Sequence, residues 1–171
     1  MTTPLVLTVI SADKPGLVES IAQVITRHGG NWLESRMARM AGQFAGILRV
    51  DIAADKVDAL RTDLTGLTSL GINVQAAVSG QADEPALQVM HLNLLGNDRP
   101  GIVHEVSQIL ARHGVNVDKL ETECSPAPMS ADLLFKASAR LGIQAQTDLD
   151  SLRADLEHLA DDLMVELSET D

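Results

Sequence analysis

The stretch Asp13-Lys14-Pro15-Gly16-Leu17-Val18 decides the fold, because the chain repeats it as Asp98-Arg99-Pro100-Gly101-Ile102-Val103. A second phrase, Arg27-His28-Gly29-Gly30-Asn31, returns as Arg112-His113-Gly114-Val115-Asn116. Both pairs are separated by 85 residues (98 − 13 and 112 − 27). A constant offset of this kind indicates that one supersecondary unit has been duplicated. The sequence therefore predicts two units of the same fold.

Hydrophobic periodicity predicts a strand followed by a helix at the start of each copy. The apolar runs at 5–10 and 90–95 read as buried strands with one apolar face. A helix is predicted over 15–28, with an equivalent helix in the second copy. The matching strand positions are Leu5, Leu7 and Val9 against Met90, Leu92 and Leu94. The helical stripes are Leu17, Val18, Ile21, Val24 and Ile25 against Ile102, Val103, Val106, Ile109 and Leu110.

Two strands, a second helix and a last strand complete each copy. The paired strands are predicted at 31–41 and 43–52, joined tightly at Ala41-Gly42-Gln43, and at 115–124 and 131–140, joined by the longer Ser125–Ser130 segment. Apolar residues spaced by three and four predict the second helices. They are Val57, Leu60, Leu64 and Leu67 in one copy and Leu149, Leu152, Leu156, Leu159 and Leu163 in the other. Final strands are predicted at 72–78 and 163–168.

The resulting order, β-α-β-β-α-β twice, predicts an α+β protein made of two ferredoxin-like units. Each unit would have an antiparallel four-stranded sheet with both helices on one face. We expect one domain at 1–79, a polar linker with Gly and Pro at 80–86, and a second domain at 87–171. The sheet face without helices must be solvated or covered, and a second copy of the chain is the simplest cover.

The chain has a net charge of −11, and most of it lies in the second copy. Residues 1–85 contain seven Lys or Arg and nine Asp or Glu, whereas 86–171 contain six and fifteen. No basic run occurs, and nucleic-acid binding needs cations that displace phosphate counterions. Direct nucleic-acid binding is therefore disfavoured. The acidity serves either solubility or docking to a protein partner.

The single cysteine, Cys124, excludes an internal disulfide. In a strand-like segment it is expected to be a small core residue, with a redox role as the alternative. The first residues lack the positive region of a signal peptide, and no apolar stretch has membrane-spanning length. We therefore expect a cytoplasmic protein without membrane contact.

His28 and His113 are placed by the pattern in the last turn of the first helix of each copy. A partial positive charge there suits the helix dipole. Gly29 and Gly114 follow as natural residues beyond the helix end. We expect a structural role for the two histidines, with a ligand or catalytic role as the alternative.

The repeated loop has the chemistry of a small-anion site. The fixed φ of Pro15 suits a first helical turn, and Asp13 is close enough to cap free N–H groups there. Gly16 lacks a Cβ, so a ligand can approach the backbone. A helix N-terminus offers N–H donors and partial positive charge to an amino-acid carboxylate, while Asp13 can accept the ammonium group. The alternative is a capped turn with no ligand.

No catalytic or cofactor-binding pattern is found in the sequence. The Ser, His and Asp residues form no nucleophile elbow, and Cys and His lack metal-site spacing. Gly29-Gly30 ends a helix, where a phosphate-binding loop would begin one. We expect no enzymatic activity, no metal site and no cofactor.

The pattern Asp-x-Pro-Gly-[Leu/Ile]-Val, followed by a helix ending in His-Gly-x-Asn, resembles the ACT domain over nearly the whole chain, twice. ACT domains are small ferredoxin-like modules that bind amino acids and similar effectors, commonly at interfaces between copies. The resemblance therefore implies a homo-oligomer and ligand-binding residues in both copies. These residues are Asp13, Lys14, Pro15, Gly16 and Asn31, and Asp98, Arg99, Pro100, Gly101 and Asn116.

A narrower resemblance is carried by Asn31–Met40 together with Gln43-Phe44. This segment, the length and the tandem layout are similar to the glycine cleavage system transcriptional repressor family. Members of that family act by holding a transcriptional activator inactive, without binding DNA, and glycine relieves the repression. The resemblance implies an amino-acid-responsive repressor that acts through a protein partner. Val115 in place of Gly30, and the Ser125–Ser130 segment, imply that the two loops need not bind alike.

Two other functions are compatible with these residues. The units could form a purely structural interaction module, in which the loops are only turns. They could also form a regulatory subunit for a metabolic enzyme. Because the charge is uneven, we expect the first copy to sense the amino acid and the second chiefly to dock on the partner.

Overall fold

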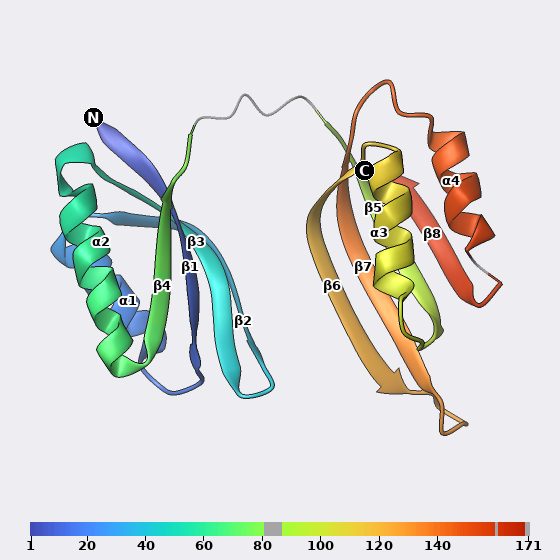
Figure 1. Ribbon diagram of the computed structural model, residues 1–171, viewed down its shortest axis with the longest axis horizontal. Helices are drawn as coiled ribbons and strands as arrows, with labels where there is room; N and C mark the ends of the chain where they lie inside the picture. The colour runs from blue at the N-terminus through green and yellow to red at the C-terminus, as the bar shows by residue number, and fades with distance from the viewer. Residues whose placement is uncertain (81–86, 160, 170–171) are drawn as a thin grey trace. The chain divides into compact units, whose positions relative to one another are not determined.

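The computed structural model describes residues 1–80, 87–159 and 161–169. The chain divides into two compact units, Met1–Ala82 and Asp83–Asp171 (Figure 1). The linker expected at 80–86 lies outside the described residues except for Gly80.

Each unit has the predicted order β-α-β-β-α-β. The first contains β1 (Thr2–Ala12), α1 (Leu17–Arg27), β2 (Asn31–Met40), β3 (Gln43–Ala53), η1 (Ala54–Lys56), α2 (Val57–Gly66), η2 (Leu67–Leu70) and β4 (Ile72–Val78), where η1 and η2 are short 3₁₀ helices. The second contains β5 (Gln88–Asn97), α3 (Ile102–Arg112), β6 (Asn116–Pro126), β7 (Leu133–Ile143), α4 (Leu149–His158) and β8 (Leu163–Glu169). The predicted elements are therefore confirmed, with strands up to several residues longer than the apolar patterns alone.

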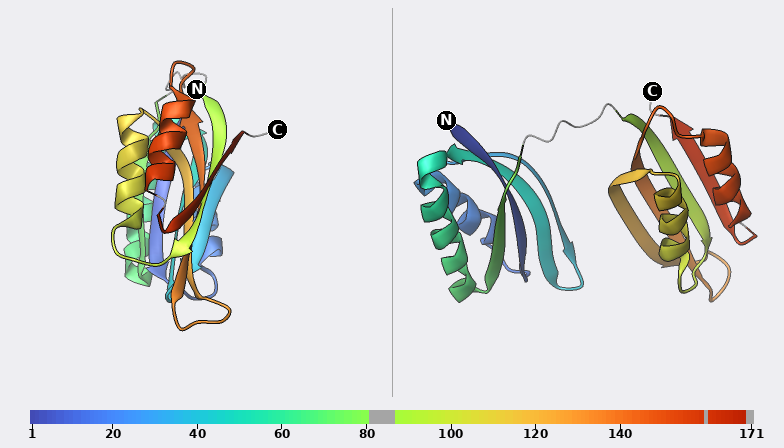
Figure 2. Two further views of the ribbon diagram at one scale, coloured as in Figure 1. Left: turned by 90° about the vertical axis from the view of Figure 1, so that its right-hand side faces the viewer. Right: turned by 45° about the horizontal axis from the view of Figure 1, so that its top comes forward.

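The two sheets have the same topology. Their strand orders are β2-β3-β1-β4 and β6-β7-β5-β8, and all neighbouring strands are antiparallel. Two helices cover one face of each sheet and leave the other face without helices (Figures 1 and 2). This confirms the α+β, ferredoxin-like fold class.

Each unit has its own aliphatic core between its sheet and its helices. Leu5, Leu7 and Val9 of β1 are buried, as are their counterparts in β5, which are Met90, Leu92 and Leu94. The helical stripes supply the other side of each core, because residues three and four apart lie on one helix face. The one-sided burial of the first strand was predicted from its alternation and is confirmed.

The two hairpins differ as the sequence indicates. Ala41 and Gly42 have φ values of +48° and +79°, so both central residues are left-handed, as a tight two-residue hairpin requires. Pairing between β6 and β7 continues to Pro126 and Leu133. The longer connection is therefore Ala127–Asp132, because the first two residues of the predicted loop belong to β6.

Cys124 is exposed, so its expected place in the core is wrong. The physical reason is that β6 lies at the edge of its sheet, and every residue of this strand is exposed. A strand-like pattern does not reveal whether the strand is central or at an edge.

The two histidines connect the helices within each unit. His28 follows α1 and places Nε2 2.8 Å from Asp63 Oδ2 of α2. His113 follows α3 and places Nε2 2.8 Å from Asp155 Oδ2 of α4. The two histidines thus have the expected structural role: each lies at a helix end and also bonds to a carboxylate of the other helix in its unit.

No helix in the described part of the chain is both long and apolar enough to span a membrane.

Replacing Leu156 by Ala should destabilise the second unit by about 3 kcal/mol, because this side chain is fully buried and its loss leaves a cavity. Amide hydrogen exchange measured unit by unit should show the loss in 87–159 and leave protection in 1–80 unchanged. Leu70→Ala is the control, since Leu70 is 52% exposed and should cost less than about 0.5 kcal/mol. Equal loss in both units would contradict separate cores.

The pKa of Asp155 is lowered from its ordinary value of 3.8, chiefly by the hydrogen bond with His113. The pair therefore stabilises the folded state above the ordinary pKa, and this contribution is lost as the pH falls through the lowered value. Carbon-detected NMR titration should show the Asp155 pKa rising in His113→Ala. His28→Ala, the matched change in the other unit, should leave it unaltered; an equal rise there would contradict the assignment.

Candidate functional site

The two repeated loops have the same backbone at the start of α1 and α3. Gly16 has φ +89° and ψ +3°, and Gly101 has φ +93° and ψ −5°. These values are typical of the third residue of a type II turn, in which proline favours the second position. The positive φ therefore favours glycine at both positions. It explains these glycines better than the approach of a ligand to the backbone, which was assumed from the sequence.

Two predictions about this loop are wrong. Helix α1 begins at Leu17, so Pro15 lies in the preceding turn and not in the first helical turn. Asp13 does not cap the helix, since Gly16 holds the cap position and no side-chain cap bond is made. Asp13 instead contacts the hairpin between β2 and β3. Its N–H donates to the Gly42 carbonyl at 2.9 Å, and its carboxylate lies 3.6 Å from Arg39 Nη1.

The first loop is open. Its residues from Asp13 to Gly16 are exposed, and no atom lies within 4 Å of where a Cβ on Gly16 would be. Lys14 Nζ donates to the carbonyl of Leu70, a neutral acceptor. The Ser20 hydroxyl donates to the Gly16 carbonyl at 2.9 Å and so takes no N–H donor of the helix end. The start of α1 is therefore accessible to a small anion.

The second loop carries an ion pair that sequence reasoning missed. Arg99 Nη1 and Nη2 donate to Glu105 Oε1 and Oε2 at 2.9 and 2.7 Å. The hydrogen bond from Arg99 lowers the pKa of Glu105. The signal was present in the repeat, because Glu105 occupies the position that Ser20 holds in the first copy (20 + 85 = 105). Asp98 repeats the anchoring of Asp13, with its N–H donating to the Leu133 carbonyl at 2.8 Å.

Asn31 and Asn116 open β2 and β6, as the sequence indicates, but they lie far from the loop of their own unit. Asn31 pairs with Asp51, which pairs with Pro4 near the start of β1. The loop follows the other end of β1, so about eight residues, or roughly 26 Å, separate the two sheet ends. Asn116 is placed equivalently through Gly142 and Val89. One unit alone does not bring the asparagine and the loop together.

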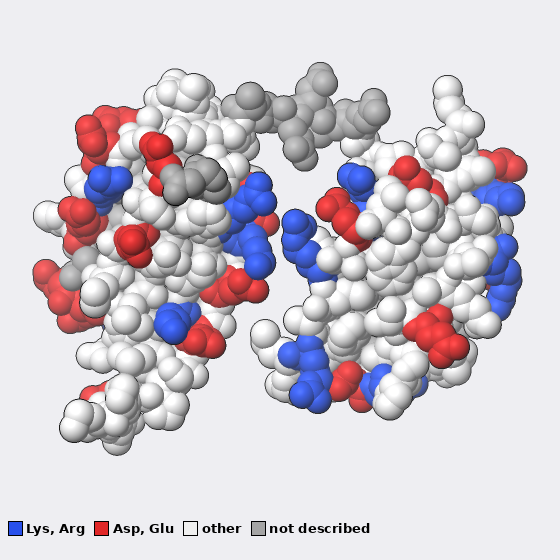
Figure 3. Space-filling view, turned by 180° about the vertical axis from the view of Figure 1, so that it is seen from behind, with Lys and Arg blue, Asp and Glu red and all other residues white. Residues whose placement is uncertain are grey.

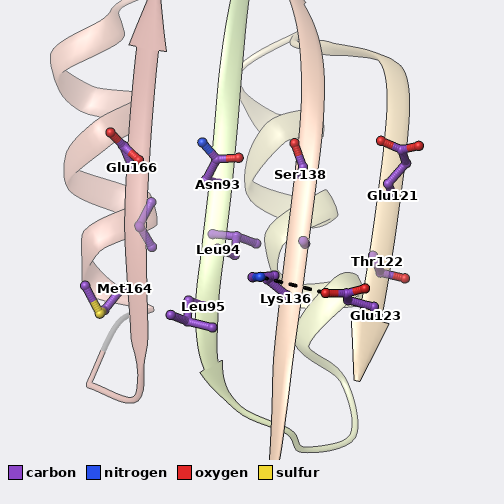
Figure 4. A pocket seen from close by; sticks show the side chains of 12 residues that line it. Asn93, Leu94, Leu95, Glu121, Thr122, Glu123, Lys136, Ser138, Met164 and Glu166 are labelled. Atoms are coloured by element: carbon purple, nitrogen blue, oxygen red, sulfur yellow. Dashed lines mark ion pairs between the residues drawn. The ribbon is translucent and has the colours of Figure 1, made fainter. Parts of the chain in front are cut away.

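A hollow of about 710 Å³ lies on the helix-free face of the second sheet (Figure 4). Asn93 and Ser138 lie on its two inner strands, between Glu121 and Glu166 on the outer strands. Lys136 Nζ lies 3.8 Å from Glu123 Oε1. The alternation of polar residues in these strands indicated this face, but the sequence showed no hollow.

Charge is mixed on the surface seen in Figure 3, where Lys or Arg and Asp or Glu lie beside one another on both units. Two ion pairs join residues of neighbouring strands, namely Arg49–Glu34 and Lys136–Glu123, and Lys119–Glu121 lies within β6. Within the residues that the structure describes, no group of three or more His, Cys, Asp or Glu could hold a metal ion.

Replacing Gly16 by Ala should cost about 1 kcal/mol, because an L-residue is strained at this positive φ even where space is free. Gly66→Ala is the matched control: its surroundings are equally open, but its φ is −60°. Here Ala should stabilise by about 0.5 kcal/mol. Urea unfolding of both variants measures the difference, and equal effects would contradict the argument.

Comparisons with known proteins agree with this geometry. An ACT-domain model matches residues 3–77 and a second ACT-domain model matches residues 90–139. An unknown protein from Galdieria sulphuraria has 26% sequence identity and a TM-score of 0.88, with 100% of both chains covered. A protein proposed to be a glycine cleavage system transcriptional repressor has 16% identity and a TM-score of 0.69, with 99% of both chains covered. No curated protein matches the sequence. The chain belongs to the ACT-domain family and carries two ACT domains in tandem.

Proposed function

We propose that this chain is an amino-acid-responsive regulatory protein that represses the glycine cleavage system through a protein partner, with glycine as its signal. The observation that carries the proposal is the open loop at Asp13–Gly16, where a left-handed glycine leads into a helix without a side-chain cap. Such a helix start favours a carboxylate, because its N–H groups and partial positive charge point toward it.

The glycine link rests on similarity. The same tandem fold, over 99% of both chains, is found in a protein proposed to be a glycine cleavage system transcriptional repressor. The segment 31–40 supports the same family. The alternative of a regulatory module for a metabolic enzyme uses the same loops and differs only in the partner.

Action through a protein partner is supported by charge. The net charge of −11 disfavours contact with a phosphate backbone. The second unit carries most of this charge, and its helix-free face offers a broad hollow with three glutamates along it. We propose that the second unit contributes more to docking, and the first more to sensing.

The positions of the asparagines support a homo-oligomer. A ligand at the Asp13–Gly16 loop is about 26 Å from the Asn31 position of the same unit by strand length. An ACT domain of a second copy can supply an asparagine at the loop. Under this proposal Asn31 and Asn116 act on loops other than their own, and sedimentation should show a dimer or larger assembly.

Glycine binding is the direct test. Isothermal titration of the full chain with glycine should give a saturable heat, because the loop fits a small carboxylate. Lys14→Ala should weaken binding by about threefold to tenfold, since it removes a cation from an exposed site. Lys56→Ala, outside the loop, is the charge-matched control. Absence of heat with glycine and with every other standard amino acid would overturn the sensing function.

The mode of action needs a separate experiment. The chain should not retard DNA of the glycine cleavage promoter in a gel, but should retain the transcriptional activator of that operon on an affinity column. Glycine should weaken this retention. DNA binding without the activator, or retention of an enzyme in its place, would contradict the proposed mode of action.

A further inference from the structure

The two loops share their backbone but differ in side chains, and two of these differences bear on the loop cation. Lys14 corresponds to Arg99, and Ser20 corresponds to Glu105, both at the offset of 85 residues. Ser20 is small and bonds to the loop carbonyl of Gly16. Glu105 is long enough to reach back from the first turn of α3 to Arg99. The repeat is therefore symmetric in its backbone, but the acidic residue of the first helical turn is Glu19 in α1 and Glu105 in α3.

The Glu105 carboxylate lies directly beside the second loop. Its Oε1 atom is 3.6 Å from where a Cβ on Gly101 would be, whereas the same position on Gly16 has no neighbour within 4 Å. The two terminal guanidinium nitrogens of Arg99, Nη1 and Nη2, donate to this carboxylate at 2.9 and 2.7 Å. Bidentate pairs of this geometry are among the stronger hydrogen-bonded contacts in proteins. The cation of the second loop is thus already occupied by an internal carboxylate.

The cation of the first loop has no such partner. Lys14 donates to the carbonyl of Leu70, and it forms no ion pair within 4.0 Å in the part of the chain that the structure describes. A charged carboxylate is a stronger acceptor than a neutral carbonyl. The carboxylate of a free ligand can therefore pair with Lys14 more readily than with Arg99.

A second acid also acts on this loop. The hydrogen bond with Glu105 raises the pKa of Arg99, and the negative charge of Asp162 acts in the same direction. A second anion at this loop would meet Glu105 and Asp162, whose charges already act on Arg99. Like charges at short range repel.

We propose that Glu105 takes the place of a ligand carboxylate at Arg99, so that a free amino acid binds at the first loop and is excluded from the second. This proposal rests on the function proposed above. An internal group joined by a short linker acts at an effective concentration in the millimolar range. A ligand that binds Arg99 no more tightly than Glu105 does must exceed that concentration to displace it.

Two reciprocal variants test the proposal in the full chain. Glu105→Ser gives the second loop the residue of the first and should open it. Lys14→Arg combined with Ser20→Glu gives the first loop the pair of the second and should close it. The variants exchange side chains between two matched backbones, so each serves as the control of the other.

Nitrogen-15 NMR with glycine as the probe reads the loops separately, because Gly16 and Gly101 each have an amide N–H. In the unmodified chain only Gly16 should shift, and calorimetry should give one site per chain. Glu105→Ser should add a shift at Gly101 and a second site. Lys14→Arg with Ser20→Glu should weaken the response at Gly16 by at least about tenfold.

The outcomes separate this inference from the function on which it rests. Equal shifts at Gly16 and Gly101 in the unmodified chain, or no response at Gly101 in Glu105→Ser, would overturn the inference and leave amino-acid sensing intact. No response at either glycine in any variant, with glycine or other amino acids, would overturn both. If Glu105→Ser unfolds the second unit, Glu105→Gln keeps the side-chain size, removes the charge and gives the same test.

Discussion

The positive φ of one glycine at the end of the first strand is the constraint on which each unit depends. Gly16 and Gly101, at +89° and +93°, turn the chain from the sheet into the first helix. That turn sets which helix face meets the sheet and so buries the apolar stripe of α1 or α3. It also leaves the helix start without a side-chain cap. The same backbone geometry thus supports both the core and the proposed binding of an anion.

The two units show how a duplicated backbone can acquire different surfaces. The histidine pairs His28–Asp63 and His113–Asp155 are equal in length and link the helices in the same way. These shared contacts stabilise the fold. In contrast, the cations of the two loops have different partners, a backbone carbonyl for Lys14 and the Glu105 carboxylate for Arg99. Core contacts are preserved where packing demands them, whereas exposed positions have been free to diverge.

Much of the fold followed from pattern alone, because strands and helices differ in their apolar period. The β-α-β-β-α-β order, the buried face of β1 and the Ala41-Gly42 turn were all predicted. Element ends were less accurate, since ladder hydrogen bonds extend strands beyond the apolar runs. The core position of Cys124 was wrong because a pattern does not show that β6 is an edge strand. The cap assigned to Asp13 was wrong because the turn leaves that residue beside the hairpin.

The sequence by itself determined the duplication, the fold class, the core faces and the two loops, since these depend on local spacing and residue type. Only the tertiary structure decided which loop residues meet. It placed Asn31 and Asn116 at the opposite end of the sheet from their own loops, and it joined Glu105 to Arg99 over the second loop. Those facts depend on strand register and on side-chain reach in space, and neither is expressed in the linear order of residues.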